Sequence, residues 1–447
     1  MNPNDARSVL SAPALADGYD LVVDLVASRG STLVDARNGR EFLDMFSFFA
    51  SLPLGMNHPR LTGDAEFVDE LTRAALCRPS NHDVYTLEAA RFVSTFSRVV
   101  GDPELPHLFF VDGGALAVEN AIKVAFDWKS RRNEAAGRSP GLGTKVVHLR
   151  HAFHGRSGYT LSLTNTDPAK TERFPRFDWP RVDSPAVTFP LHDHVWDVWA
   201  AEKASLRQIE DAFVANRHDV AAFVFEPIQC EGGDRHLRPE YLQAVQELCL
   251  EHDVLLIADE VQTGMGVTGT TWACQQLGVR PDVLAFGKKA QVCGVMAGRR
   301  VDLVPDNVFR VASRISSTWG GGLVDMVRAR RILEVIESDG LVARAGVLGQ
   351  QLLGELTALC ARHPQTLHNP RGRGLLAAVT LRDAALRDEV LRVAREEEDL
   401  LLLPCGPDGI RFRPALTVTS AELSDATGRL DRVLAGLAGV APIRLAA

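Results

Sequence analysis

The stretch that decides the fold is LFFVDGGALAVENAIKVAFDWKSRR, residues 108–132. Its first part, LFFVDGG, is an apolar run ending in two glycines, which is typical of a strand followed by a turn. Apolar residues then recur at positions 118, 121, 122, 125 and 126, the spacing of one face of a helix. We therefore expect a strand, a tight turn and a helix in direct succession.

The same alternation of short strands and helices continues downstream. Further strands are predicted at 145–150, 221–227, 254–260 and 282–289, and each of them is apolar on both faces. Strands of this kind belong in a mostly parallel sheet that is covered by helices. The sequence therefore predicts an α/β fold.

The pattern changes towards the C-terminus. A long helix is predicted at 323–336, and the strands predicted after it, at 375–381, 400–404 and 410–416, alternate with helices. Because a single hydrophobic core rarely grows beyond about 250–300 residues, a chain of 447 residues is expected to form more than one unit.

We divide the chain into three segments on this basis. Residues 86–315 are predicted to form a large α/β domain, with helices on both faces of its sheet. Residues 1–85 are predicted to be an N-terminal arm and part of a small domain, and residues 316–447 to be the C-terminal part of that small α+β domain.

The composition limits the classes of function. Hydrophobic residues make up 46% of the chain and charged residues 24%, which excludes disorder. Lys and Arg number 49 against 57 Asp and Glu, a net charge of -8, so we expect no nucleic-acid partner. Residues 1–22 lack the basic start and apolar core of a secretion signal, and no uncharged apolar stretch approaches the length of a membrane span. We expect a cytoplasmic protein with no membrane partner.

The seven cysteines do not form a metal-binding or disulfide pattern. They are scattered, odd in number and never in a CxxC pair. We expect buried thiols, with Cys230 and Cys293 as the two that lie near the motifs described next.

Three features are predicted at strand ends of the large sheet. Gly113, Gly114 and Ala115 lie where a strand turns into a helix, and free N–H groups and the helix dipole favour a phosphate there. Asp259 ends a buried strand, and Lys288 ends the next one. Each feature has an ordinary structural explanation when taken alone: a tight turn, a helix cap or a solvated lysine.

The combination is more specific than its parts. An anion site, a carboxylate that can pair with a pyridinium nitrogen and an amine that can form a Schiff base are what pyridoxal 5'-phosphate requires. The sequence therefore predicts a pyridoxal phosphate enzyme whose cofactor lies in the 86–315 domain.

Several motifs strengthen this prediction. Five motifs follow one another along the chain: GGALAVENAIK, HAFHGRSGYT, EPIQ, DEVQTG with GK downstream, and IRFRPAL. In these motifs and their order the sequence resembles the fold-type I aminotransferases of class III. Within that class, three segments resemble the sequences of the L-lysine 6-aminotransferases: HLFFVDGGALAVENA, FGKKAQVCGVMAGRRV and STWGG. The resemblance extends from about Gly18 to Gly436.

The resemblance implies roles at the cofactor. Lys288 would be the Schiff-base lysine, with the adjacent Lys289 as its rival, and Asp259 would pair with the pyridine nitrogen. Gly114 and Ala115 would donate backbone N–H groups to the phosphate. Phe153 would stack on the cofactor ring, and Val261 would cover the other face of the ring. Gln262 would approach the phenolic oxygen. Thr318 would bind the phosphate from the partner subunit of a homodimer.

The resemblance also implies the reaction. The ε-amino group of L-lysine would pass to 2-oxoglutarate by a ping-pong mechanism, giving L-glutamate and 2-aminoadipate 6-semialdehyde, which should cyclise. The donor brings a methylene beside its reacting carbon, whereas 2-oxoglutarate brings a carboxylate, so an arginine that serves one would be left unpaired by the other. Glu231 and Arg411 resemble a switch pair that solves this problem, with Arg413 competing for the role of Arg411. Arg156 would bind the carboxylate far from the reacting carbon.

Three positions depart from the subfamily pattern. Ser316 stands where asparagine is expected and would lie near the substrate carboxylate, Cys230 replaces a glycine, and Ala415 replaces a proline.

Two other functions stay open: another ω-aminotransferase of the ornithine or 4-aminobutyrate type, and a non-catalytic pyridoxal phosphate-binding regulator. The second usually carries a basic helix-turn-helix segment, which we do not find before the first motif.

Overall fold

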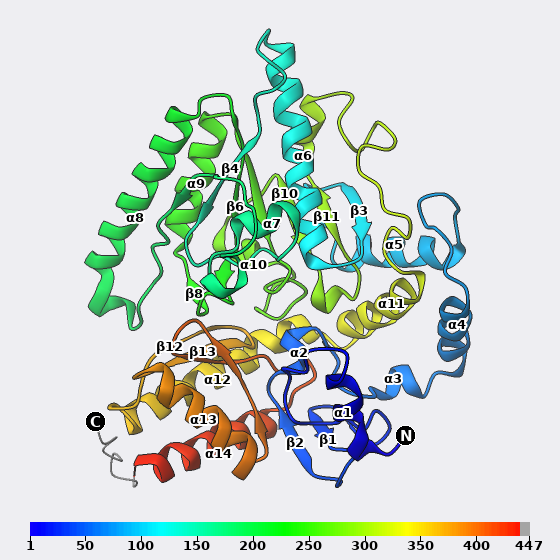
Figure 1. The fold of residues 1–447 in the computed structure, drawn as a ribbon, viewed down its shortest axis with the longest axis vertical. Coiled ribbons are helices and arrows are strands. Elements are labelled where there is room, and N and C mark those ends of the chain that lie inside the picture. Colours follow the sequence, from blue (N-terminus) through cyan, green and yellow to red (C-terminus); the bar gives the residue numbers. More distant parts are fainter. Residues whose placement is uncertain (439–447) are drawn as a thin grey trace.

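The structure is a computed structural model that describes residues 1–438. Its largest sheet has seven strands (Figure 1). The last nine residues of the predicted 316–447 segment lie outside the described residues. The strand order is β3-β11-β10-β9-β6-β4-β5. The strands of this sheet are β3 (His107–Val111), β4 (Lys145–Leu149), β5 (Arg181–Val182), β6 (Val220–Phe225), β9 (Leu255–Asp259), β10 (Val283–Phe286) and β11 (Cys293–Ala297).

The prediction of a mostly parallel sheet is confirmed. β10, β9, β6, β4 and β5 pair in parallel along the order of the sheet. β11 runs antiparallel to both of its neighbours, β10 and β3. The sequence analysis did not predict β11, which begins five residues after Lys288.

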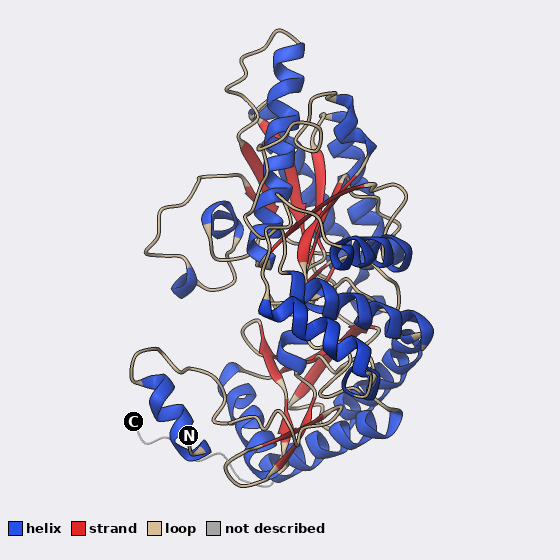
Figure 2. Ribbon diagram, turned by 90° about the vertical axis from the view of Figure 1, so that its right-hand side faces the viewer, coloured by secondary structure: helices blue, strands red, loops and turns tan. Residues whose placement is uncertain are grey.

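Helices cover both faces of this sheet, as Figure 2 shows. Side chains of β6 alternate between the faces: Ala222 and Val224 belong to the core beneath one helix layer, and Phe223 and Phe225 to the core beneath the other. α6 covers the first face, and α8 and α9 cover the second, where α5 and α11 also pack further along the sheet. These helices and their shorter neighbours are α5 (Leu87–Val99), α6 (Gly114–Ala135), α7 (Gly158–Leu163), α8 (Leu191–Ala215), α9 (Pro239–Glu251), α10 (Ala273–Leu277) and α11 (Leu323–Ser338).

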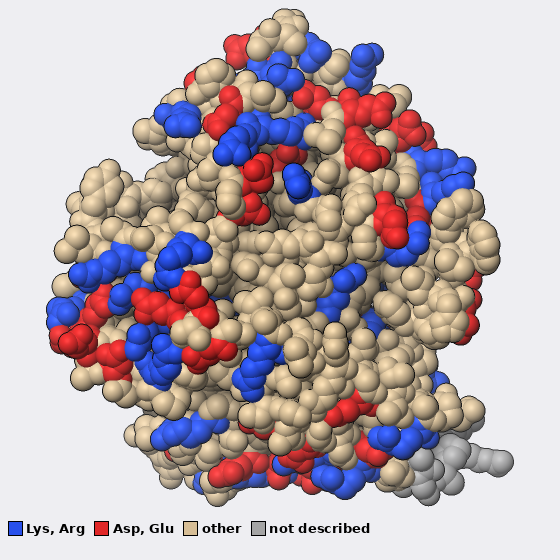
Figure 3. Space-filling model, turned by 180° about the vertical axis from the view of Figure 1, so that it is seen from behind, with Lys and Arg blue, Asp and Glu red and all other residues tan. Residues whose placement is uncertain are grey.

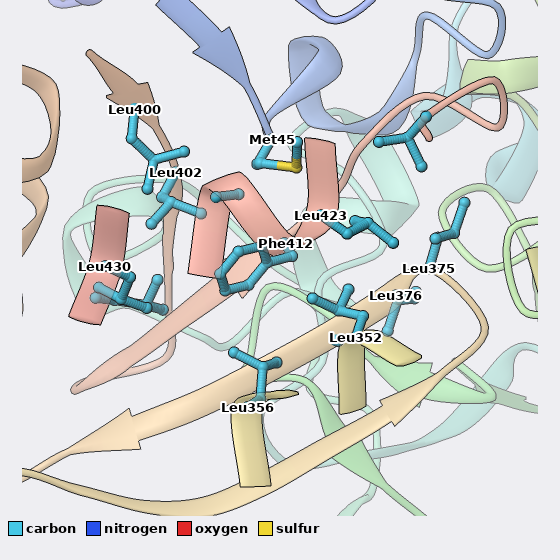
Figure 4. Close-up of a cluster of buried hydrophobic side chains, with 14 of the residues drawn as sticks. Met45, Leu352, Leu356, Leu375, Leu376, Leu400, Leu402, Phe412, Leu423 and Leu430 are labelled. Atoms are coloured by element: carbon cyan, nitrogen blue, oxygen red, sulfur yellow. The ribbon is translucent and has the colours of Figure 1, made fainter. Parts of the chain in front are cut away.

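A second, antiparallel sheet lies in the C-terminal part of the chain. Its order is β12-β13-β16-β15, and α12, α13 and α14 pack around it. Figure 4 shows the core of this region, in which Leu352 and Leu356 of α12 meet Phe412 and Leu430. The elements are α12 (Leu341–Arg362), β12 (Leu367–Arg373), β13 (Leu376–Leu381), α13 (Ala384–Glu397), β15 (Leu403–Cys405), β16 (Gly409–Phe412) and α14 (Ser420–Ala438).

The N-terminal arm joins this C-terminal region through a third sheet. β14 (Leu400–Leu401) pairs in parallel with β2 (Glu41–Asp44), which pairs with β1 (Thr32–Val34). The helices of the arm are α1 (Ala6–Ser11), α2 (Ser47–Ala50), α3 (Pro59–Thr62) and α4 (Ala65–Leu76). Segments from both ends of the chain therefore share one unit. The domain boundaries at residues 85 and 316 stay a prediction, because α11 packs against the core of the large domain and also against the core of the C-terminal region.

Lys and Arg are interspersed with Asp and Glu on the face shown in Figure 3. Within residues 1–438, no helix is both long and apolar enough to span a membrane. The short elements not yet named are β7 (Ile228–Gln229), β8 (Arg235–His236) and the 3-10 turns η1 (Pro3–Asp5), η2 (Pro168–Lys170), η3 (Lys288–Ala290) and η4 (Arg299–Leu303).

Candidate active site

A cavity of about 560 Å³ lies at the carboxyl ends of the parallel strands, where ligands bind in open α/β sheets. Residues that follow β3, β4, β6, β9 and β10 line it from one side, and residues of the N-terminal arm and β16 from the other. Ten of the twelve site residues predicted from the sequence line this cavity: Gly114, Ala115, Phe153, Arg156, Glu231, Asp259, Val261, Gln262, Lys288 and Arg411.

The start of α6 forms an anion site in the cavity wall. Gly113 has φ 102°, a conformation that favours glycine, and α6 begins at Gly114 with no side chain capping its N-terminus. A Cβ atom added at Gly114 would lie 3.0 Å from Val261 Cγ1, so a larger residue here would press on the Val261 side chain. The first N–H groups of the helix are therefore available to a phosphate.

Asp259 is a buried carboxylate at the end of β9. Its Oδ2 lies 2.8 Å from Nδ1 of His154, and its Oδ1 accepts a hydrogen bond from the Val261 N–H at 3.1 Å. These two contacts fix the orientation of the carboxylate while the side chain still lines the cavity. His154 belongs to the HAFHGRSGYT motif, but the sequence predicted no role for it, because only the fold brings it to Asp259.

Lys288 and Lys289 have different environments although they are adjacent. Lys288 lines the cavity in the left-handed region at φ 49°, where a non-glycine residue is strained. Burial, followed by the positive charge of Arg411, lowers the pKa of the Lys288 amine. Lys289 Nζ donates to the carbonyl oxygen of Gln262 at 2.7 Å, and burial lowers its pKa to about 7. Lys289 does not line the cavity, so the geometry supports Lys288 as the reactive amine.

Arg411 and Arg413 also differ in their environments. Arg411 lines the cavity, and one of its terminal nitrogens lies 3.4 Å from Oε2 of Glu231. Arg413 pairs with Asp234, and both of these side chains are fully buried. Gln262 Oε1 accepts from both arginines, at 3.3 Å and 3.2 Å. Arg411 is thus the arginine that faces the space where a substrate would bind.

Two further lining residues, Glu226 and Phe49, had no role in the sequence analysis. Glu226, in the EPIQ motif, accepts the N–H groups of Phe153 and Cys230, and burial followed by the charge of Asp259 raises its pKa well above the usual range. Phe49 lies in α2, whose four residues all have positive φ, and no local pattern predicts such a turn. Of the two cysteines expected near the motifs, Cys293 lines the cavity, whereas Cys230 is fully buried and does not line it.

Two predicted site residues are not brought to the cavity of their own chain. Ser316 and Thr318 are both exposed and do not line it. Thr318 was predicted to serve the partner subunit, and its exposure leaves it available to a second copy. The prediction that Ser316 lies near the substrate carboxylate also depends on a second copy. Among the cysteines expected to be buried, Cys77 is exposed.

The site fits pyridoxal phosphate on several independent observations. The uncapped start of α6 accommodates a phosphate, the buried Asp259 accommodates a protonated ring nitrogen, and Lys288 is a desolvated amine in the same cavity. The chain belongs to the class-III aminotransferase family, whose model matches residues 14–434. Its cofactor is pyridoxal 5'-phosphate, as predicted, and it is an enzyme of the fold-type I class.

Two relatives and one solved structure make the comparison more specific. The L-lysine-epsilon aminotransferase of Mycobacterium tuberculosis is 60% identical over 432 residues, which cover 97% of this chain and 96% of the relative. The enzyme of the same name from Streptomyces clavuligerus is 53% identical over 95% of this chain and 93% of its own length. A solved structure of the lysine aminotransferase from M. tuberculosis in the internal aldimine form has a TM-score of 0.95 at 57% identity, covering 98% of this chain and all of that one.

Proposed function

We propose that this protein transfers the ε-amino group of L-lysine to 2-oxoglutarate, giving 2-aminoadipate 6-semialdehyde and L-glutamate, in the cytoplasm. The observation that carries the proposal is the pairing of Glu231 with Arg411 in the same cavity as Lys288. The two relatives that are 60% and 53% identical to this chain support lysine as the donor.

The cofactor, when bound, supplies an electron sink for the carbon that carries the amino group. Lys288 would hold the cofactor covalently and then, as a free amine, move a proton from Cε of lysine. Its lowered pKa favours this role, because a neutral amine can act as a base. Asp259, oriented by His154, would keep the ring nitrogen protonated, while Phe153 and Val261 would enclose the ring.

Charge complementarity selects the substrate ends. Lysine brings no carboxylate to its reacting carbon, so Glu231 would neutralise Arg411 during that half-reaction. 2-Oxoglutarate brings a carboxylate there, and Arg411 would then bind it in place of Glu231. Arg156, exposed at the rim of the cavity, would bind the distant carboxylate of either substrate.

A homodimer is part of this proposal. Several large apolar side chains are exposed, among them Leu76, Tyr85 and Trp319, which are 80%, 96% and 41% exposed. Trp319 lies near the start of α6, because Arg78 stacks on its ring at 3.8 Å and pairs with Asp112. Exposed apolar side chains would be covered in a subunit contact. Trp319 directly follows Thr318, so the surface that supports dimerisation would also deliver the predicted phosphate ligand.

The test is product identification with the holoenzyme. Lysine and 2-oxoglutarate should give glutamate and the cyclised aldehyde, and lysine should be preferred to ornithine and 4-aminobutyrate in kcat/KM. A preference for either of these two amines would replace the lysine proposal with the alternative ω-aminotransferase. The absence of transfer from lysine, with transfer from no other amine tested, would contradict the proposed substrates.

A further inference from the structure

Lys170 contacts the switch pair although no motif includes it. It ends η2, a short turn in which the Asp167 side chain accepts the N–H of Ala169. Lys170 Nζ donates to Oε1 of Glu231 and lies 5.5 Å from the centre of the Phe153 ring. The Lys170 and Glu231 side chains are only 25% and 28% exposed, so this ion pair is shielded from solvent more than a surface pair.

The two oxygens of Glu231 serve two different cations. Oε1 contacts Lys170, whereas Oε2 contacts Arg411 at 3.4 Å. Charge-assisted hydrogen bonds are usually about 2.7–2.9 Å long, so the contact with Arg411 is the looser of the two. Glu231 can therefore release Arg411 without giving up Lys170.

We propose that Lys170 is a specificity-determining positioning residue, which holds the Glu231 carboxylate when Arg411 turns to the carboxylate of 2-oxoglutarate or glutamate. The proposal rests on the function proposed above. Without Lys170, a displaced Glu231 would be a partly buried carboxylate with no cationic partner, and such a group is costly. With Lys170, displacement breaks one ion pair and keeps the other.

The ionisation of Glu231 is consistent with this role. Burial acts to raise its pKa, but the hydrogen bond from Lys170 and the charge of Arg411 outweigh burial, and the pKa is lowered. Lys170 thus favours the charged form of Glu231 independently of Arg411.

An ordinary structural role makes a different prediction. If Lys170 only anchored η2 or covered Phe153, its loss would disturb the cavity for all substrates alike. If it acts through Glu231, its loss should impair only those substrates that displace Glu231 from Arg411. Glutamate and 2-oxoglutarate do so, and lysine does not.

The experiment compares single-turnover half-reactions of the holoenzyme in Lys170→Met, Lys170→Arg and the parent. Lys170→Met should weaken the reaction with glutamate by about 5- to 10-fold in kcat/KM, mainly through KM, and leave the reaction with lysine within about 2-fold. Lys170→Arg should restore most of the loss. Lys203→Met is the matched control, since Lys203 lies over Trp199 at 3.7 Å in α8, outside the cavity lining.

Two further measurements separate the explanations. Glutarate, an unreactive dicarboxylate, should bind the Lys170→Met holoenzyme about 5-fold more weakly than the parent by calorimetry. In a Glu231→Ala background, Lys170→Met should have no further effect on the glutamate reaction, because its partner is absent.

Equal slowing with glutamate and lysine, no change with either, or an undiminished effect of Lys170→Met in the Glu231→Ala background would overturn the proposal. A parent that reacts with glutamate but not with lysine would instead overturn the proposed function. In that case the ratio of glutamate to 4-aminobutyrate turnover still tests Lys170, since 4-aminobutyrate also presents a methylene at its reacting carbon.

Discussion

The two sides of the cavity differ in how they are held. On the cofactor side, Gly114, Asp259 and Lys288 lie at strand ends of one sheet, and the contact between Asp259 and His154 is 2.8 Å long. On the substrate side, Glu231 lies in the turn between β7 and β8 and Arg411 in β16, and they approach only to 3.4 Å. Glu231 is 28% exposed, whereas Asp259 is 6% exposed.

This difference matches what each side must do. A cofactor stays in one place through both half-reactions, and buried groups with fixed orientations would hold it there. Substrates with different charge at the reacting carbon alternate in the same space, so the groups that meet them must exchange partners. Long contacts and partial exposure on the substrate side permit that exchange.

The largest effect should follow from the loss of the reactive amine on the cofactor side. Lys288→Ala should lower kcat by about 10⁴-fold or more, because the proton transfer and the covalent attachment both depend on it. Borohydride should attach the cofactor to the parent and to Lys289→Ala but not to Lys288→Ala, as peptide mapping would show. An adduct on Lys289 in the parent would mean that the assignment is wrong.

The next largest effect concerns the switch on the substrate side. Glu231→Ala leaves Arg411 unpaired when lysine occupies the site, and losing one partner of a desolvated pair costs about 2–5 kcal/mol, or roughly 30-fold and more. The half-reaction with lysine should slow by this factor, whereas glutamate brings its own carboxylate and should react as fast or faster. Single-turnover rates with the two donors check this. Equal slowing would assign Glu231 to support of the fold.

A smaller effect is expected at the predicted subunit contact. Thr318→Ala should weaken cofactor binding by about 1.5–3 kcal/mol if the hydroxyl of one subunit donates to the phosphate in the other. Equilibrium dialysis against pyridoxal phosphate measures the change, and Ser317→Ala is a neighbouring control. Parent-like affinity in Thr318→Ala would remove this residue from the site.

The smallest effect is a pH dependence of the free energy of unfolding, and it comes from Asp44, which precedes the turn that carries Phe49. Oδ1 of Asp44 accepts the N–H groups of Phe46 and Ser47, which lead into the turn that carries Phe49. Burial raises the pKa of Asp44 to about 6, so the folded protein holds this proton more tightly than the unfolded chain. The contribution of Asp44 to stability therefore falls as pH rises from about 4 to about 6.

Asp44→Asn tests this directly, because it keeps the accepting oxygen and removes the charge. The variant should be more stable than the parent by about 1–2 kcal/mol at pH 8, and the difference should shrink at pH 4. Denaturant unfolding at the two pH values measures it. A difference that is the same at both values would contradict the raised pKa.

The cofactor side was largely readable from the sequence, and the substrate side was not. A strand end followed by GG, DE or GK predicts where chemical groups gather, because parallel strands end at one edge of the sheet. The roles of Glu231 and Arg411 came only from the resemblance to a family. Phe49 and Lys170 could not be predicted, since a left-handed turn and a single-turn 3-10 segment leave no periodic signal. His154 needed the fold to bring it to Asp259, 105 positions away.

The most direct test of the central claim is to follow which nitrogen leaves lysine. L-Lysine labelled with nitrogen-15 at the ε position, incubated with the holoenzyme and 2-oxoglutarate, should give labelled glutamate, whereas lysine labelled at the α position should give unlabelled glutamate. Mass spectrometry of the glutamate reads out both. The reverse pattern, with the label transferred only from the α position, would mean that Arg411 binds the lysine carboxylate and that Glu231 does not select the terminal amine.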